Sequence, residues 1–112
     1  MKCINKRTGE QIAQQVEEAR TFWSRLKGLM FRKGLAEGHA LLLDPCPQIH
    51  TCFMRFNIDV LFLDKQNHVV AVLENFKPWR MSKFYRRSHH TLELGAGALQ
   101  GRVQVGDELN FN

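Results

Sequence analysis

Short apolar runs separated by turn-forming residues fill most of the chain after Gly38, and this pattern constrains the fold more than any other feature. Each run is only four to six residues long, which is typical of a β-strand and short for a helix. The runs cover residues 40–43, 49–54, 60–63, 69–73, 91–94 and 108–111. Residues 64–67 (DKQN) link two of them as a hairpin. The pattern therefore predicts six short strands.

The N-terminal part adds a hairpin and a helix. Residues 2–5 and 11–14 flank a turn at 6–9, where Gly9 can adopt a positive φ. Phe22, Leu26 and Leu29 recur at helical spacing, and flanking Thr21 and Gly28 can cap a helix over about residues 21–28. We therefore expect a mainly β fold, a single compact β-sandwich or small barrel with this one short helix. The alternative is an α+β sheet with a covering helix.

Length and composition limit the class of protein. A chain of 112 residues, 44% of them hydrophobic and 24% charged, has the size and composition of one globular domain, so we expect residues 1–112 to form a single domain. The first ten residues lack the apolar stretch of a secretory signal, and no apolar run is long enough to cross a bilayer. Three cysteines without C-x-x-C spacing indicate free thiols. We expect a soluble cytoplasmic protein without membrane contact.

The net charge of +5 comes from one segment. Residues 77–90 contain five Lys and Arg residues and no acid, whereas the rest of the chain balances at 11 basic and 11 acidic residues. The cations, which are candidates for anion binding, are Lys77, Arg80, Lys83, Arg86 and Arg87. They alternate with aromatic residues, a combination found in single-strand nucleic-acid binders. The simpler interpretation, which we favour, is a structural connection whose aromatic side chains pack on the core.

The segment 50–59 (HTCFMRFNID) is the most unusual stretch of the chain. As a strand it would place His50 and Cys52 on one face, as metal ligands or as a thiolate with its base. We favour a buried, unreactive Cys52 and predict no metal site, because no further ligands lie at a recognised spacing. Arg55 and Asp59 flank a bend and either form an ion pair or act together as an anion clamp.

An acidic residue, Glu93, interrupts the apolar run 91–94. Its side chain either faces water or points inward, where it needs a cationic partner such as Arg32 or Arg55. Glycines follow at 95 and 97, but without the order of a phosphate-binding loop, and we expect no cofactor. His89 and His90 would lie on opposite faces of a strand, which is poor geometry for one metal ion.

Three segments, taken together, resemble the domain-of-unknown-function 192 family. They are residues 28–32 (GLMFR), 50–64 (HTCFMRFNIDVLFLD) and 92–97 (LELGAG), and residues 105–109 (VGDEL) are similar to the family's last turn and strand. The resemblance implies a compact, mainly β fold and assigns no reaction, substrate or cofactor. It nominates the residues that match the motifs, which are Arg32, Met54, Arg55, Asp59, Phe62 and Glu93.

This chain departs from the family in two respects. Many members carry WMKNT where residues 53–57 here are FMRFN, so a ligand contact through that Trp or Thr would be absent. Many members also carry an export signal, so the compartment of this protein can differ from theirs.

The interpretation that the sequence favours is a binding module for a small anionic ligand or an acidic partner. Its candidate ligand-binding residues are Arg32, His50, Arg55, Asp59 and Glu93. One alternative is a hydrolase or transferase built on His50, Arg55, Asp59 and Glu93, with Cys52 as a nucleophile. Another is single-stranded nucleic-acid binding through residues 77–90. We predict that Arg32, Arg55, Asp59 and Glu93 converge in one charged cluster at an edge of the core.

Overall fold

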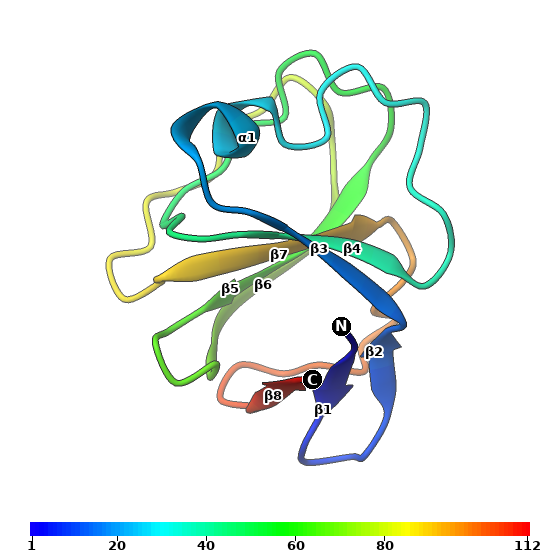
Figure 1. Ribbon diagram of the computed structural model, residues 1–112, viewed down its shortest axis with the longest axis vertical. Helices are drawn as coiled ribbons and strands as arrows, with labels where there is room; N and C mark the ends of the chain where they lie inside the picture. Colours follow the sequence, from blue (N-terminus) through cyan, green and yellow to red (C-terminus); the bar gives the residue numbers. More distant parts are fainter.

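The computed structural model describes all residues, 1–112, and contains two β-sheets and one short helix (Figure 1). The larger sheet has the order β3-β4-β7-β5-β6, in which β3 runs parallel to β4 and the other neighbours are antiparallel. The smaller sheet has the order β2-β1-β8 and is antiparallel. The elements are β1 Cys3–Asn5, β2 Gln11–Ala13, β3 Gln15–Ala19, α1 Phe22–Lys27, β4 His39–Leu43, β5 Ile58–Leu63, β6 Val69–Phe76, β7 His90–Gly95 and β8 Leu109–Phe111. The predicted mainly β fold is confirmed, as two sheets without a closed barrel.

The larger sheet is buried on both faces at its centre, because every residue of β5 is buried. Alternation along this strand sends Leu61 and Leu63 into one hydrophobic cluster and Val60 and Phe62 into another. In the neighbouring strands too, the side of the sheet to which a side chain points decides which of the two cores it joins.

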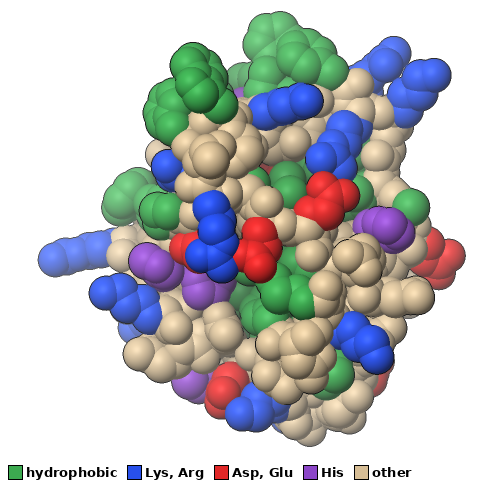
Figure 2. Space-filling view, viewed as in Figure 1, with side chains coloured by type: hydrophobic (Ala, Val, Ile, Leu, Met, Phe, Trp, Pro, Cys, Tyr) green, Lys and Arg blue, Asp and Glu red, His purple; other side chains and the backbone are tan.

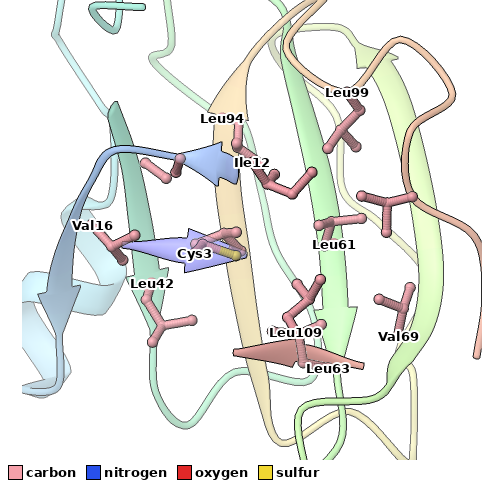
Figure 3. Close-up of a cluster of buried hydrophobic side chains, with 14 residues drawn as sticks. Cys3, Ile12, Val16, Leu42, Leu61, Leu63, Val69, Leu94, Leu99 and Leu109 are labelled. Carbon is pink, nitrogen blue, oxygen red and sulfur yellow. The ribbon is translucent and has the colours of Figure 1, made fainter. Parts of the chain in front are cut away.

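The smaller sheet covers the first of these faces. Leu61 and Leu63 meet residues of the small sheet and of the C-terminal loop, including Cys3, Ile12 and Leu109 (Figure 3). The second face is covered differently, by α1 and by the loops that follow β4 and β6 (Figure 1). We call this covering layer, residues 20–38, 44–57 and 77–89, the cap.

The helix α1 forms where the sequence predicts it, but it does not bury an apolar face. Thr21 forms a capping box with Ser24, and Gly28 ends the helix with φ +46°. No residue within α1 is buried, and Phe22 is 63% exposed. Only Leu29, just beyond the helix, enters the core. Helical spacing thus identified the helix but not its orientation.

One predicted strand is absent, and one observed strand was not predicted. Residues 49–54 do not form a strand; only an isolated bridge pairs His50 with Met81. Phe53 has φ +63°, a left-handed conformation that interrupts an extended chain. In addition, β3 was missed, because Gln15, Glu17 and Glu18 leave it without an apolar alternation. The predicted hairpins at residues 2–14 and 60–73 are confirmed, although β6 extends to Phe76.

No helix of this structure combines the length and the apolar character needed to cross a membrane.

Candidate functional site

A buried glutamate lies at the centre of the larger sheet, on the face that the cap covers. Glu93 in β7 is 2% exposed, and the register places it between Leu41 of β4 and Val60 of β5. Both neighbours are apolar, so no side chain beside Glu93 within the sheet can accept or donate a hydrogen bond. Any polar partner of its carboxyl group must come from the cap.

The Glu93 carboxyl group lines a small pocket of about 40 Å³ under the cap. The end of α1 and the loop after β4 supply most of the walls, including Arg25, Gly28, Cys46 and His50. A cavity needs at least roughly 10–15 Å³ to hold one water molecule, so this pocket has room for only a few atoms the size of oxygen. We call it the Glu93 pocket.

Two residues that line this pocket each carry a buried polar atom without a hydrogen-bond partner, Glu93 Oε1 and Arg25 Nε. One is a carboxyl oxygen and the other an N–H donor. The end of Arg25 is held from outside by a hydrogen bond from Nη1 to the Pro45 carbonyl, 3.0 Å long. Buried polar groups in proteins nearly always have partners, so two such atoms in one pocket indicate a place where a ligand or water binds.

Gly28 allows the helix end to close over the carboxyl group. A Cβ atom at this position would lie 3.6 Å from Glu93 Oε1, and the backbone has φ +46°. A side chain here would be strained and would project toward the carboxyl oxygen.

Burial raises the pKa of Glu93 from 4.5 to about 8, although the positive charge of Arg32 opposes this shift. The carboxyl group is therefore mostly protonated at neutral pH and can donate a hydrogen bond. Arg25 and Lys27 also line the pocket, so the nearby side-chain charges are positive. Burial likewise raises the pKa of the Cys46 thiol, which keeps it protonated and donating to the Gln48 carbonyl.

His50, a sequence candidate, lines the same pocket but is held by the backbone through both ring nitrogens. Nδ1 accepts from the Cys52 amide at 3.1 Å, so Nε2 carries the hydrogen and donates to the Leu26 carbonyl at 3.1 Å. His50 thus ties the loop after β4 to the end of α1. Cys52 itself is partly exposed, so the expectation that it is buried was wrong.

Asp59 lies on the other face of the sheet, away from Glu93. It alternates with Val60, so its side chain points toward the core shared with the small sheet. Its two oxygens accept hydrogen bonds from the backbone amides of Asn75 and Leu99, at 2.9 and 3.0 Å. Asp59 is fully buried and anchors two loops.

The predicted cluster of four charged residues is therefore not assembled. Arg55 is exposed and forms no ion pair, so the predicted bond to Asp59 is absent. Arg32 pairs with Glu17 at 3.4 Å and is close enough to Glu93 to affect its pKa. Of the candidate residues, only His50 and Glu93 share the pocket, with Arg32 nearby.

The basic segment 77–90 is an ordered part of the cap. Backbone bonds join it to the loop after β4, among them Thr51 N to Arg80 O and Ser82 N to Ile49 O, at 2.8 and 2.9 Å. Its five cations are all exposed, and none forms an ion pair. Of its aromatic residues, Tyr85 packs on Phe62, whereas Trp79 and Phe84 are more than half exposed. The aromatic side chains thus pack on the core only in part.

Exposed hydrophobic side chains gather on the end of the molecule that carries α1 (Figure 2). The Phe53 ring lies between Phe31 and Trp79, with ring centroids 5.5 Å from Phe31 and 4.7 Å from Trp79. Phe22 and Trp23 form a second pair on α1. We call these five side chains the aromatic surface; a surface of this kind is typical of a place where a partner or ligand binds.

Arg25 and Cys46 were not among the sequence candidates. Each comes from a segment that only the packing of the cap brings to Glu93. The one signal in the sequence was an acid within an apolar run. It suggested Arg32 or Arg55 as a cationic partner, and Arg32 does lie close to Glu93, but it gave no indication of Arg25.

A family comparison agrees with this architecture. The family model described as an uncharacterised ACR, the domain-of-unknown-function 192, matches residues 3–111. The chain belongs to this family. A UPF0127 protein of Pyrococcus furiosus is 34% identical, with 97% of each chain covered. A UPF0127 protein of Thermococcus sibiricus is 30% identical over 96% of this chain and 73% of its own length.

Two solved structures share the fold. A protein from Sinorhizobium meliloti named a "putative transcription regulator" has a TM-score of 0.83 and 25% identity, covering 97% of this chain and 89% of its own. A protein of unknown function from Novosphingobium aromaticivorans has a TM-score of 0.78 and 18% identity, covering 99% and 93%. These relatives support the fold, and none of their names assigns a reaction.

Proposed function

We propose that this protein is a small binding module whose Glu93 pocket receives the carboxylate group of a small anionic ligand. The observation that carries the proposal is the pair of buried polar atoms without partners, Glu93 Oε1 and Arg25 Nε, in one pocket. With the proton of neutral Glu93 on Oε1 and the N–H of Arg25 on Nε, the pocket offers two hydrogen-bond donors, which match the oxygens of an anion.

The charges around the pocket favour an anion over a cation. A neutral Glu93 donates its O–H, Arg25 donates its Nε–H, and the positive charges of Arg25, Lys27 and Arg32 attract a negative group. Hydrogen bonds from such donors to a carboxylate are short and roughly twice as strong as neutral ones. Since the pocket measures about 40 Å³, only the head group enters, and the rest of the ligand lies outside.

Titration with acetate, followed in amide NMR spectra, tests the proposal. We expect shifts of the Arg25, Gly28 and Glu93 amides that saturate at about pH 6 and weaken by tenfold or more above about pH 9, where Glu93 is ionised. Methylammonium, a cation of similar size, should leave these amides unchanged.

Glu93→Gln is the informative variant, because its amide keeps a donor and cannot ionise. Its acetate affinity should stay constant across the same pH range. Glu74→Gln, at an exposed glutamate, is the matched control and should follow the wild type. Acetate binding that is equally strong at both pH values in the wild-type protein, or shifts confined to residues 77–90, would contradict the proposal.

The arrangement gives less support to a hydrolase or transferase. Asp59 and Glu93 lie on opposite faces of one sheet, and both nitrogens of His50 are bonded to the backbone. His50, the base that the sequence suggested for the Cys52 thiol, is therefore not free to activate it.

A second candidate function is single-stranded nucleic-acid binding, and one observation favours it: five exposed cations without ion pairs next to exposed Trp79 and Phe84. The name of the Sinorhizobium meliloti relative is in keeping with it. An acidic protein partner would use the same cations.

Retention of an oligonucleotide at increasing salt tests this second function. Use of all five cations predicts a log–log salt slope of about −3.5, and reversing Arg86 and Arg87 to Glu should reduce it by about 1.4. Lys65→Glu, on the β5–β6 turn, is the control and should change the slope little. No retention at low salt would remove this candidate.

We further propose that residues 1–112 act as one domain and that the protein works in the cytoplasm. The three free cysteines support a reducing compartment. Fractionation of cells that express the tagged protein tests this location.

A further inference from the structure

A second cluster of chemically active side chains lies at the start of β7, three residues before Glu93. Asp44 directly follows β4, and His90 is the first residue of β7. The ladder between these strands ends at Leu43 and Thr91, so Asp44 and His90 occupy the next opposed positions. His89 precedes the strand, and alternation therefore does not fix its direction.

The structure brings the three side chains together. Asp44, His89 and His90 each offer a ligand atom, and these atoms all lie within 4.8 Å of one another. Asp44 Oδ1 is 3.5 Å from His89 Nε2. The expectation that the two histidines lie on opposite faces was wrong, because only His90 belongs to the strand.

His90 is oriented in the manner of a metal ligand. Its side chain is buried, with the residue 8% exposed, and Nε2 lies 2.5 Å from Asn67 Oδ1. An amide oxygen only accepts, so Nε2 carries the hydrogen and Nδ1 carries a lone pair. Nδ1 is buried and has no hydrogen-bond partner. Metal-binding histidines commonly donate their second nitrogen to a carbonyl or carboxylate in this way.

Asp44 is also held by a neighbour. Its Oδ2 lies 3.5 Å from Arg20 Nη1, which leaves Oδ1 directed at His89. In known metal sites the ligating carboxylates are themselves hydrogen-bonded, and these outer partners fix the orientation of the ligands.

We infer that Asp44, His89 and His90 form a binding site for a divalent first-row transition metal ion of the Zn²⁺ or Co²⁺ type. Two imidazoles and one carboxylate are a donor set that such ions prefer, whereas Ca²⁺ and Mg²⁺ prefer oxygen alone. Bonds of about 2.1 Å place tetrahedral ligand atoms roughly 3.4 Å apart, so a small closure of this cluster completes the site. Three protein ligands leave a coordination position open. The site is independent of the Glu93 pocket.

Titration of the purified full chain with Co²⁺, followed by its visible absorption and by calorimetry, tests the inference. We expect one ion per chain, with the spectrum of mixed nitrogen and oxygen ligands and without the intense near-ultraviolet band of a thiolate ligand. His89→Asn, at a partly exposed side chain, should weaken the affinity by at least about tenfold and keep the fold. His90→Asn should weaken it at least as much.

Asn67→Gly distinguishes a metal site whose ligands are oriented by their neighbours from histidines that bind metal only weakly at the surface. Asn67 has φ +64°, which glycine accepts, so this variant removes only the acceptor that orients His90. We expect about tenfold weaker Co²⁺ binding. His39→Asn, at an exposed histidine outside the cluster, is the matched control and should bind as the wild type does.

Nitrogen NMR of the histidine rings reports the tautomer of His90 and the nitrogen that binds the metal. Without metal, His90 should show the tautomer with hydrogen on Nε2, and Zn²⁺ should shift its Nδ1 resonance. Absence of Co²⁺ binding, binding unchanged in His89→Asn and Asn67→Gly, or a thiolate band would overturn the inference.

Discussion

Replacing Glu93 with glutamine should change how the stability of the protein depends on pH. The folded pKa of about 8 lies above the value of 4.5 expected in the unfolded chain. Below about pH 4.5 both states are protonated, and as pH rises toward 8 only the unfolded state loses its proton. The free energy of unfolding of the wild-type protein therefore falls across this window because Glu93 ionises more readily in the unfolded state. Glutamine at this position cannot ionise, so the variant shows no such fall from this residue.

The size of the effect follows from the pKa difference. Each pKa unit corresponds to about 1.36 kcal/mol, so a shift from 4.5 to about 8 amounts to roughly 5 kcal/mol once the folded carboxyl group has ionised. At pH 7 the loss is about 3 kcal/mol. Since Glu93 is 2% exposed, little of this is screened by solvent.

Urea unfolding followed by circular dichroism, at several pH values from about 4.5 to 8, measures the effect. The free energy of unfolding of Glu93→Gln minus that of the wild type should rise by about 3 kcal/mol between pH 4.5 and 7. Because the other titratable groups contribute equally to both proteins, their contributions to the free energy of unfolding cancel in this difference. The same difference for the exposed Glu74→Gln should stay flat. Parallel curves for Glu93→Gln and wild type, within about 0.5 kcal/mol, would refute the reasoning.

Three further predictions concern other parts of the chain. Asp107→Asn should lower the free energy of unfolding by about 1 kcal/mol at neutral pH, because hydrogen bonds from Arg7 and Asn5 hold the pKa of Asp107 at about 2. In urea unfolding this loss should vanish as the pH falls toward 2. A loss that is unchanged at low pH would contradict the prediction. Gly28→Ala should destabilise by about 1 kcal/mol and weaken acetate binding, both measurable on one sample, and a fully stable variant would contradict the assigned φ. A thiol reagent should label only Cys52 in the native protein and all three cysteines in urea. Cys3 and Cys46 are buried, and burial raises the pKa of Cys3 to about 12. Rapid labelling of Cys3 in the native protein would contradict this packing.

The sequence was informative where burial and local pattern coincide. The run 60–63 predicts β5 because a strand with both faces covered is mostly apolar, and all four of these residues are buried. Thr21 and Gly28 mark the ends of α1 through bonds that involve only neighbouring residues. The pattern failed at residues 49–54, where Ile49 and Met54 enter the second core from a loop instead of a strand.

The candidate site was only partly predictable for a related reason. An acid between two leucines left open whether Glu93 faces water or the core, and the structure buries it. Its distance from Asp59 depends on strand register, which places Glu93 opposite Val60 and so sends the two acids to opposite faces. Arg25 reaches the pocket through the packing of α1, which no local pattern in the sequence records.

Carbon NMR of the Glu93 side-chain carboxyl group, titrated with and without acetate, tests the central claim most directly. We predict a midpoint near 8 in the free protein and a higher midpoint with acetate, because the anion binds the protonated form. A midpoint near 4.5, or one that acetate leaves unchanged at concentrations that shift the pocket amides, would contradict the account.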